Sequence, residues 1–147
     1  MNRLIKTLLL LFVVAGFSMT ACKKDSDSKS NEEKLTGASC WKQSKVEAQD
    51  PFTGSWVEDT IDDCDKDDCI TFNEDKTLDF DEGAVKCDPS DPQTATGTWS
   101  LSADGTTLTL NDPNSGSFTG TVTELTDSKL VLEIDVLGFK SRITFTN

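Results

Sequence analysis

Five cysteines and 26 acidic side chains are the residues of this 147-residue chain whose types could carry chemistry, because the sequence contains no histidine. Without an imidazole, the chain cannot form a Ser-His-Asp or Cys-His catalytic arrangement or a zinc site with a histidine ligand. The carboxylates are numerous enough for a catalytic pair, but a domain of this size offers little cleft for a glycosidase-type reaction. We therefore expect a protein that is not an enzyme and that needs no cofactor.

Cys22 stands where a hydrophobic N-terminus turns into a charged stretch. After a short basic start, residues 7–17 are almost continuously apolar, a run too short for an ordinary transmembrane helix and typical of the central region of an export signal. Small residues then lead to Ala21 and Cys22. This pattern resembles the lipobox of bacterial lipoproteins, although Met19 stands where leucine is more usual. The resemblance implies a signal peptide over residues 1–21 and a lipid on Cys22, whereas the alternative is a plain secretory signal that ends near a cysteine.

The charge of the exported chain limits its partners. The net charge of −12 becomes −14 once residues 1–21 are removed, because that segment holds two basic residues and no acidic one. A surface so acidic repels nucleic acid and anionic membrane surfaces. We therefore exclude nucleic acid as a partner. We expect the lipid on Cys22 to attach the protein to the outer membrane, on its periplasmic or cell-surface face.

The other four cysteines are Cys40, Cys64, Cys69 and Cys87. An even number of cysteines in an exported chain predicts disulfides, because the compartments outside the cytoplasm are oxidising. Two disulfides can form in three pairings, and the sequence spacing leaves all three open. A zinc site built from the four thiolates is the competing interpretation, but it lacks paired C-x-x-C spacing and needs reduced thiols.

The stretch DCDKDDCITFNE at residues 63–74 is the candidate for metal binding. Asp63, Asp65 and Asp67 take the first, third and fifth positions of a calcium loop, and Glu74 takes the twelfth. The glycine that such a loop needs for its sharp turn is replaced by an aspartate, and the flanking sequence predicts loop and strand instead of two helices. We therefore prefer a solvated acidic loop without a metal, and keep weak calcium binding by this stretch as a minor alternative.

From Leu35 onward, short runs of alternating β-forming and polar residues are separated by turn residues, at the spacing typical of an antiparallel barrel or sandwich. In KLVLEIDV, residues 129–136, most apolar side chains fall on one face and the charged ones on the other. The sequence predicts eight such strands, near residues 40–46, 69–72, 77–80, 96–101, 106–110, 118–125, 129–136 and 142–146. Eight meandering strands can hide their apolar faces and their edges by closing into a barrel.

Two segments do not fit the strand pattern. Residues 22–34 contain no apolar side chain after the first cysteine, so nothing there can offset the entropy cost of ordering, and we expect a flexible tether. Residues 47–68 form a long connection that could hold one short helix or strand near Trp56. The expected organisation is a signal peptide, the tether, and one all-β domain over residues 35–147, an eight-stranded antiparallel up-and-down β-barrel.

The barrel domain resembles the lipocalin-like domains of lipoproteins from Bacteroidetes-type bacteria. The similarity runs from about Leu35 to the C-terminus. It includes Trp41, the stretch DDCDKDDCITFNEDKTLDF at residues 62–80, and EGAVKCDPSDPQTATGTWSLSADGTTLTL at residues 82–110. The resemblance implies a small lipocalin-like up-and-down barrel, which the strand count predicts separately. It implies little about activity, because this family mostly has no assigned ligand.

The resemblance also bears on the disulfides. It implies that Cys64 pairs with Cys87, since it treats these two loop-like acidic positions as paired. Cys40 is then left to pair with Cys69. Each of these two precedes a residue expected to point inward, so both should point outward on neighbouring strands. Each bridge should stabilise the fold by roughly 2–4 kcal/mol, mainly by restricting the unfolded chain.

The interior and mouth of the barrel are the predicted binding site. The expected interior is large and apolar, which favours a packed core with at most a small cavity. The aromatic side chains expected in the interior or at the mouth are Trp41, Trp56, Phe72, Phe80, Trp99 and Phe118. The leading hypothesis is a monomeric, lipid-anchored, non-enzymatic lipoprotein that binds a small apolar ligand or another surface component.

The rival hypothesis is a protein-interaction module whose acidic loops engage a basic protein partner. The position of the exposed aromatic residues separates the two hypotheses. A hollow mouth covered by Trp56 and the connection over residues 47–68 would favour ligand binding. A solid barrel with an outward acidic patch would favour a protein partner.

Overall fold

The computed structural model describes residues 28–113 and 116–147. The predicted signal peptide, Cys22 and residues 23–27 of the predicted tether lie outside the described residues. The described part has one short helix, α1 (Asn31–Thr36), followed by the strands β1 (Lys42–Gln49), β2 (Trp56–Asp59), β3 (Cys69–Phe72), β4 (Thr77–Asp81), β5 (Thr94–Leu101), β6 (Thr107–Asp112), β7 (Gly116–Leu125), β8 (Lys129–Val136) and β9 (Phe139–Thr146). No helix in this part of the chain has the length and apolar character needed to cross a membrane.

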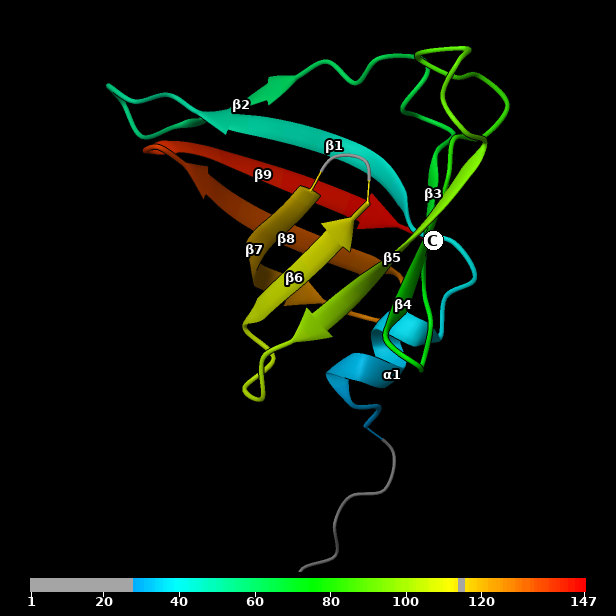
Figure 1. The fold of residues 1–147 in the computed structure, drawn as a ribbon. Helices are drawn as coiled ribbons and strands as arrows, with labels where there is room; N and C mark the ends of the chain where they lie inside the picture. The colour runs from blue at the N-terminus through cyan, green and yellow to red at the C-terminus, as the bar shows by residue number, and fades with distance from the viewer. Residues whose placement is uncertain (1–27, 114–115) are drawn as a thin grey trace, which may run out of the picture.

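The strands form one antiparallel sheet that curls round on itself (Figure 1). The strand order is β2-β1-β9-β8-β7-β6-β5-β4-β3, so β3 to β9 meander and β9 returns to β1. All eight predicted strands are present, which confirms the all-β, up-and-down architecture. The described sheet has nine strands instead of eight, because β2 forms a hairpin with β1. Asp50 holds the turn of this hairpin by accepting hydrogen bonds from the backbone N–H groups of Phe52 and Thr53, at 2.9 and 2.8 Å.

The two sides of the curled sheet meet between the start of β1 and β3. Trp41 and Ile70 exchange both of their backbone N–H···O bonds, at 2.8 and 2.9 Å. Next to this bridge, a disulfide joins Cys40 to Cys69, whose Cα atoms lie 5.3 Å apart. The pairing is the one that the family resemblance left for these two cysteines. One backbone bridge and one disulfide therefore hold the cylinder together at this level.

The inward side chains form one apolar core. Its buried members are Leu35, Ala38, Trp41, Phe72, Leu78, Trp99, Leu108, Leu110, Leu130, Leu132 and Phe145. Phe72 and Trp99 pack edge to face, with ring centroids 5.5 Å apart and an interplanar angle of 84°. The space between Phe72, Leu110 and Leu132 leaves no room for a water molecule. This part of the barrel is solid, as we predicted from its apolar interior. The prediction of at most a small cavity is wrong for the other end, where about 450 Å³ is open.

The helix α1 closes one end of the barrel, where it lies against three turns (Figure 1). Glu32 pairs with Lys76 of the β3–β4 turn at 2.6 Å. Asn31 lies so close to Gly105 in the β5–β6 turn that a Cβ there would collide with it. Lys34 donates a hydrogen bond to the backbone carbonyl at the end of β7. The helix therefore lies across the strand turns at this end.

The predicted flexible tether over residues 22–34 is wrong at its C-terminal end, because the helix begins at Asn31. Ser30 and Glu33 form a capping box, in which each side chain accepts a hydrogen bond from the other residue's backbone N–H. Leu35 is the side chain that makes ordering favourable, since it is fully buried. The Nε1–H group of Trp41 also donates to the Leu35 carbonyl at 2.9 Å.

Candidate functional site

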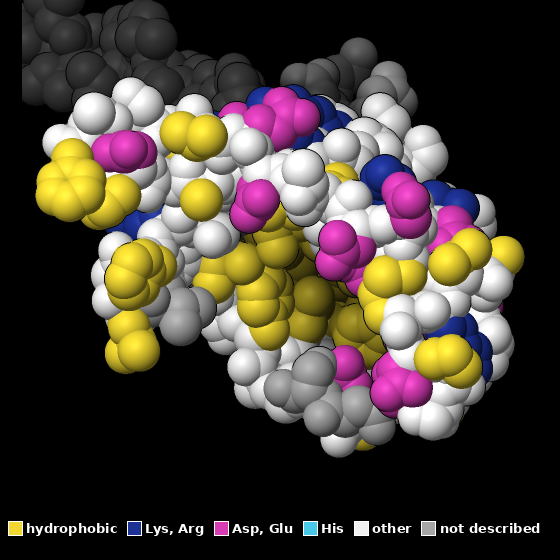
Figure 2. All heavy atoms as spheres, turned by 90° about the horizontal axis from the view of Figure 1, so that it is seen from above, with side chains coloured by type: hydrophobic (Ala, Val, Ile, Leu, Met, Phe, Trp, Pro, Cys, Tyr) yellow, Lys and Arg dark blue, Asp and Glu magenta, His cyan; other side chains and the backbone are white. Residues whose placement is uncertain are grey.

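The barrel is hollow at the end opposite α1. A cavity of about 450 Å³ opens there, a size within the ordinary range for small-molecule sites. The strand β4 shows that the two ends are opposite, because Lys76 before its start contacts the helix and Asp81 at its end lines the cavity. Seen from above, the hollow has a hydrophobic floor and acidic side chains around its edge (Figure 2).

The floor of the cavity follows from the strand register. Trp41 pairs with Ile70, Ile70 with Phe80, and Phe80 with Ala95, so four lining residues are successive cross-strand neighbours. Phe145 completes the floor from β9. Side chains that lie directly opposite on neighbouring strands point to the same face, here the interior. The apolar floor is thus built by rigid strands and not by loops.

The space above the floor results from small residues on β5. The inward row of this strand runs Ala95, Gly97, Trp99, from the mouth into the core, and only the last of these is large. A Cβ on Gly97 would collide with the backbone of Asn111, so no larger residue fits without moving a strand. The cavity therefore begins where the inward side chains of β5 become small.

The rim of the cavity is acidic. Six carboxylates from four segments line it. Asp65 and Asp68 come from the connection between β2 and β3, and Asp81 and Glu82 from the end of β4 and the residue after it. Asp91 comes from the β4–β5 loop and Asp112 from the end of β6. Among the described residues, neither lysine nor arginine lines this cavity. The nearby lysines have other partners, since Lys66 pairs with Asp63 at 2.5 Å and Lys86 donates to the backbone carbonyl of Asp91.

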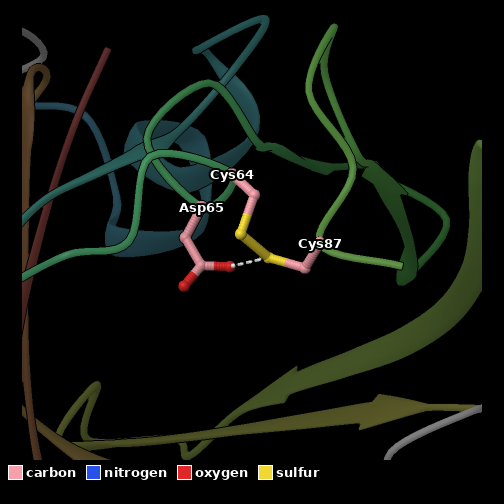
Figure 3. Close-up of side chains that lie close together, drawn as sticks. All are labelled: Cys64, Asp65 and Cys87. Atoms are coloured by element: carbon pink, nitrogen blue, oxygen red, sulfur yellow. Dashed lines mark hydrogen bonds between the residues drawn. A yellow bond between two sulfur atoms is a disulfide. The ribbon is translucent and has the colours of Figure 1, made fainter. Parts of the chain in front are cut away.

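A disulfide joins the two loops that form most of the rim. Cys64 in the β2–β3 connection pairs with Cys87 in the β4–β5 loop, as the family resemblance implies (Figure 3). Asp67 ties the same loops together by accepting a hydrogen bond from the N–H of Ala84 at 2.6 Å. Gly83 permits this contact, because its φ is +61° and a Cβ there would meet the Asp67 carboxylate. The rim is therefore held by covalent and hydrogen bonds.

Asp68 is the carboxylate whose ionisation the site most disfavours. Burial first, and then the negative charges of Glu82, Asp65, Asp67 and Asp81, raise its pKa to about 6. Its Oδ1 atom is buried and has no hydrogen-bond partner in the described part of the protein. A charged group in this position destabilises the mouth when no cation accompanies it.

Asp104 shows the opposite case at the closed end of the barrel. The hydroxyls of Ser102 and Thr106 and the backbone N–H of Thr106 donate to its carboxylate and lower its pKa to about 2. Such bonds favour the charged form of a carboxyl. The β5–β6 turn therefore stabilises its own negative charge, whereas the mouth does not.

The four residues weighed for calcium do not converge. Asp63 pairs with Lys66, while Glu74 lies in the turn beyond the other end of β3. The one metal-sized cluster among the described residues joins Asp65 to Cys64 and Cys87 (Figure 3). Its sulfurs are bonded to each other, so they are not the thiolates that a metal would need.

The six aromatic residues predicted for the site have different places. Trp41 and Phe80 line the cavity. Phe72 and Trp99 belong to the solid core, and Phe118 packs against it. Asp65 was considered only as a calcium ligand, and the other acidic residues of the rim, together with Gln43, Ile70 and Phe145, were not among the predicted ligand-binding residues. The spacing of Ala95 and Gly97 before Trp99 was the signal that could have located the hollow end of the barrel.

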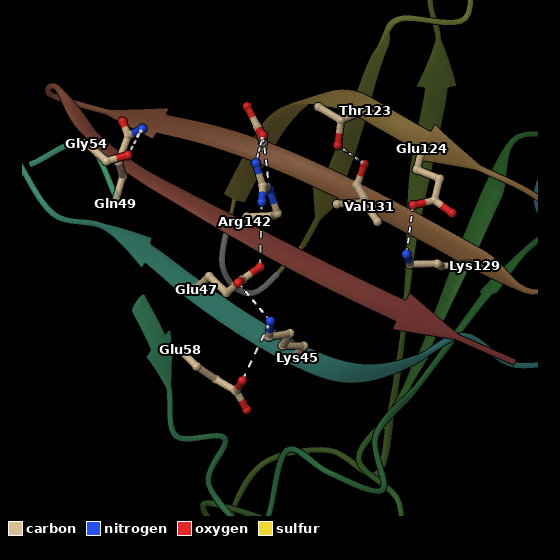
Figure 4. A network of polar contacts seen from close by, with 11 residues as sticks. Lys45, Glu47, Gln49, Gly54, Glu58, Thr123, Glu124, Lys129, Val131 and Arg142 are labelled. Atoms are coloured by element: carbon tan, nitrogen blue, oxygen red, sulfur yellow. Dashed lines mark hydrogen bonds and ion pairs between the residues drawn. The ribbon is translucent and has the colours of Figure 1, made fainter. Parts of the chain in front are cut away.

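Trp56 lies on the outer face of the sheet and does not cover the mouth. Its ring contacts the guanidinium group of Arg142, at 4.1 Å from the ring centroid. Arg142 belongs to a row of ion pairs that crosses β2, β1, β9 and β8 (Figure 4). The successive pairs are Glu58–Lys45 at 3.6 Å, Lys45–Glu47 at 2.8 Å, Glu47–Arg142 at 3.8 Å and Arg142–Glu133 at 2.6 Å. Of these pairs, only Glu58–Lys45 includes a β2 residue, and it adds, with the contact between Trp56 and Arg142, to the backbone pairing that holds β2 to β1.

Comparisons with solved structures find related folds at low sequence identity. A lipocalin-like protein from Bacteroides uniformis is 19% identical, covering 75% of this chain and 96% of that one, with a TM-score of 0.47. A DUF4847 family protein from Bacteroides vulgatus is 15% identical, covering 78% and 95%, with a TM-score of 0.53. A bovine odorant binding protein, solved in complex with a selenium-containing odorant, is 18% identical, covering 82% and 74%, with a TM-score of 0.40.

The sequence itself gives the family. No curated protein matches the chain significantly. The family model described as a lipocalin-like domain matches residues 23–132, which is most of the chain. The fold agrees with this match, because the described strands meander in one antiparallel sheet with a hollow mouth at one end. The chain therefore belongs to the family of lipocalin-like domains.

Proposed function

We propose that the protein is a lipid-anchored, non-enzymatic binding protein of the outer membrane or cell surface, and that it holds a small apolar molecule in the mouth of its barrel. The observation that supports this proposal is the cavity of about 450 Å³ above a floor of Trp41, Ile70, Phe80 and Phe145. An apolar hollow built on rigid strands gains affinity by removing ligand surface from water without first ordering a loop.

The chemistry of the cavity agrees with binding in place of catalysis. The chain has no histidine, and the sulfur atoms at the mouth are bonded in pairs. A nucleophile with a neighbouring base, the usual basis of covalent catalysis, is therefore not formed by cysteine or imidazole here. The carboxylates stand at the rim above an apolar floor and can set the charge of a bound molecule.

Ligand binding is preferred over the rival hypothesis of a basic protein partner. The barrel is solid only toward α1 and hollow at the mouth. The acidic connection between β2 and β3 turns Asp65 and Asp68 into the cavity instead of forming a wholly outward patch. The part of the expectation that placed Trp56 over the mouth is wrong, but the hollow itself favours a ligand.

Filling the cavity should weaken binding. In the variant Ala95→Trp, the new side chain would occupy the space above Phe80, its cross-strand neighbour. The affinity for a neutral apolar probe, N-phenyl-1-naphthylamine, should fall by about tenfold or more, because each methylene-sized group kept out of the cavity removes about 0.8 kcal/mol. The enhancement of probe fluorescence measures this, and urea denaturation checks that the variant folds.

Ala103→Trp is the matched control, because Ala103 is exposed in the β5–β6 turn at the closed end of the barrel. This variant adds the same side chain far from the mouth and should bind the probe as the native protein does. The proposed binding site would be wrong if Ala95→Trp folded and still bound the probe with native affinity, or if the native protein did not bind the probe.

The anchor is tested separately at Cys22. In the producing bacterium, the native protein should incorporate labelled palmitate and enter the detergent phase, whereas Cys22→Ala should lose the label completely, because the thiol is the attachment point. Met19→Leu introduces the residue more usual in this motif and should keep the label. A label that persists in Cys22→Ala would contradict the proposed anchor.

A further inference from the structure

Several carboxylates of the rim, among them Asp65, Asp68 and Asp81, face the cavity and form no ion pair with a lysine or arginine of the described residues. Asp68 is the clearest case, since its Oδ1 atom is buried and lacks a hydrogen-bond partner within the described residues. A buried carboxylate oxygen in this state is costly, because its hydration is lost and nothing replaces it. A positive charge or a hydrogen-bond donor placed beside Asp68 in the cavity would therefore stabilise this carboxylate.

Among the described residues, the groups around Asp68 supply neither a positive charge nor a hydrogen bond to its Oδ1 atom. The carboxylates of Glu82, Asp65, Asp67 and Asp81 act on it from its own loop and from β4, and all of them repel its negative charge. Asp112 adds a carboxylate from β6, and Gln43 of β1 is neutral. The nearest lysines on the rim loops are Lys66, paired with Asp63, and Lys86, bonded to a backbone carbonyl.

Within the described part of the chain, the partners of Asp81 and Asp65 are uncharged, so they do not neutralise the negative charge of these two carboxylates. Asp81 accepts hydrogen bonds from the N–H of Gly83 at 3.0 Å and from the amide of Gln93 at 2.9 Å, and both donors are neutral. Asp65 lies 3.3 Å from the sulfur of Cys87, which has no proton to donate because it is part of a disulfide (Figure 3). The rim thus keeps several full negative charges over a low-dielectric floor, where electrostatic attraction is stronger than in water.

The floor decides what kind of cation would fit. Trp41, Ile70 and Phe80 offer apolar surface directly below these carboxylates, so a bare metal ion would leave that surface unused. No three carboxylates in the described part of the chain lie close enough to share one ion. A folded basic protein would meet the outward carboxylates first and could not reach the buried oxygen of Asp68. A molecule with an apolar body and a cationic head can contact the apolar floor with its body and the carboxylates of the rim with its head.

We propose that the mouth selects a cationic amphiphile, with its apolar body on the floor of the cavity and its ammonium group beside the carboxylates of Asp68 and Glu82. This inference rests on the proposed function and narrows it to one chemical class. The raised pKa of Asp68 agrees with it, because a cation at this position would favour the ionised carboxylate and so oppose the effects of burial and of the neighbouring negative charges.

Three compounds with the same decyl chain test the proposal, because they differ in the charge of the head group. Their affinities are measured by displacement of N-phenyl-1-naphthylamine from the native protein, below the concentration at which each compound forms micelles. The buffer contains EDTA, so that no calcium ion screens the rim. Decyltrimethylammonium should bind about tenfold or more tightly than decanol, and decanoate should bind about tenfold more weakly than decanol, in line with attraction and repulsion between near charges.

Two pairs of substitutions assign the effect to the rim. The double variant Asp68→Asn and Glu82→Gln should reduce the affinity for decyltrimethylammonium about tenfold and leave that for decanol unchanged. The matched control, Asp59→Asn with Asp62→Asn, removes the same number of charges from exposed positions outside the cavity. This control should keep the preference of the native protein within about twofold, because exposed charges outside the cavity are screened by water and salt.

Lowering the pH supplies an independent readout. Between pH 8 and pH 5, Asp68 passes through its pKa of about 6 and becomes neutral. Since decyltrimethylammonium cannot titrate, its advantage over decanol should shrink over this interval, and should shrink less in the double variant. If decanol binds and the cation has no advantage, the inference is overturned and the proposed function stands. If none of the three displaces the probe, or the probe itself does not bind, both are overturned.

Discussion

Replacing Cys40 and Cys69 with alanine should lower the free energy of unfolding by about 3.5 kcal/mol, because the bridge closes a loop of 29 residues in the unfolded chain. The native state should also change locally. Beside this disulfide, the two sides of the sheet are joined by the backbone bonds between Trp41 and Ile70. These two amides should therefore exchange with solvent faster than those of the core strands. Urea denaturation measures the first effect, and hydrogen exchange measures the second.

Replacing Cys64 and Cys87 with alanine provides the matched control. This bridge spans 23 residues, so the loop-entropy cost differs from that of the other bridge by only about 0.2 kcal/mol. It joins two loops of the rim and no strand, so the amides of Trp41 and Ile70 should exchange no faster than that of Leu108 in β6. If the amides of Trp41 and Ile70 exchanged equally fast in both double variants, the Cys40–Cys69 disulfide would not be what holds the barrel closed.

The fold was predictable because the strands alternate. In runs such as KLVLEIDV at residues 129–136, the alternation of apolar and polar residues predicts which face is buried. The turns between the strands are short, so few topologies other than a meander can connect them. Alternation did not predict the burial of Val131, which is 7% exposed although it lies on the face expected to be wet. The sequence left open whether a short helix or a strand lies near Trp56. The structure has the strand β2 there, which is paired with β1 along the backbone and through Glu58 and Lys45, and which contacts Arg142 of β9 through Trp56.

The site was less predictable than the fold, because its parts are distant in the sequence. Whether an inward aromatic ring lines a cavity depends on the sizes of its neighbours across several strands. Phe80 is at the mouth because Ala95 lies opposite it, whereas Phe72 is in the solid core because Trp99 packs against it. The acidic rim had been interpreted as a solvated loop. Its direction depends on the Cys64–Cys87 disulfide and on the contact between Asp67 and Gly83, and neither follows from local sequence.

The two ends of the barrel divide stability and binding between them. At the closed end, charges are paired or hydrogen-bonded, as at Asp104 and between Glu32 and Lys76. At the open end, carboxylates lie close together, and two buried oxygens, Oδ1 of Asp67 and Oδ1 of Asp68, have no hydrogen-bond partner among the described residues. Unfavourable electrostatics of this kind persist where function requires them and where the remaining structure is stable enough to tolerate them. The stability of the closed end is therefore what allows the mouth to stay charged.

That stability should depend strongly on one side chain outside the sheet. Leu35→Ala should lower the free energy of unfolding by about 2–5 kcal/mol, the usual range for truncating a fully buried leucine. Leu35 is the residue through which α1 enters the core, and its exposed fraction is 0%. A helix of six residues is not stable by itself in water. Loss of this contact should therefore release the whole helix and break the hydrogen bond from Trp41 to the Leu35 carbonyl.

Thr36→Ala is the control for this prediction, because Thr36 is the next residue of the same helix and is partly exposed. It should change stability by less than about 1 kcal/mol, since alanine favours the helix and the hydroxyl bonds only to the Glu32 carbonyl. Urea denaturation compares the two variants, and trypsin should cleave after Lys34 faster in Leu35→Ala alone. Equal stability of the two variants would mean that α1 rests on the barrel without closing it. The solid end would then be held by the strands themselves, since Leu78, Leu108 and Leu132 are also fully buried.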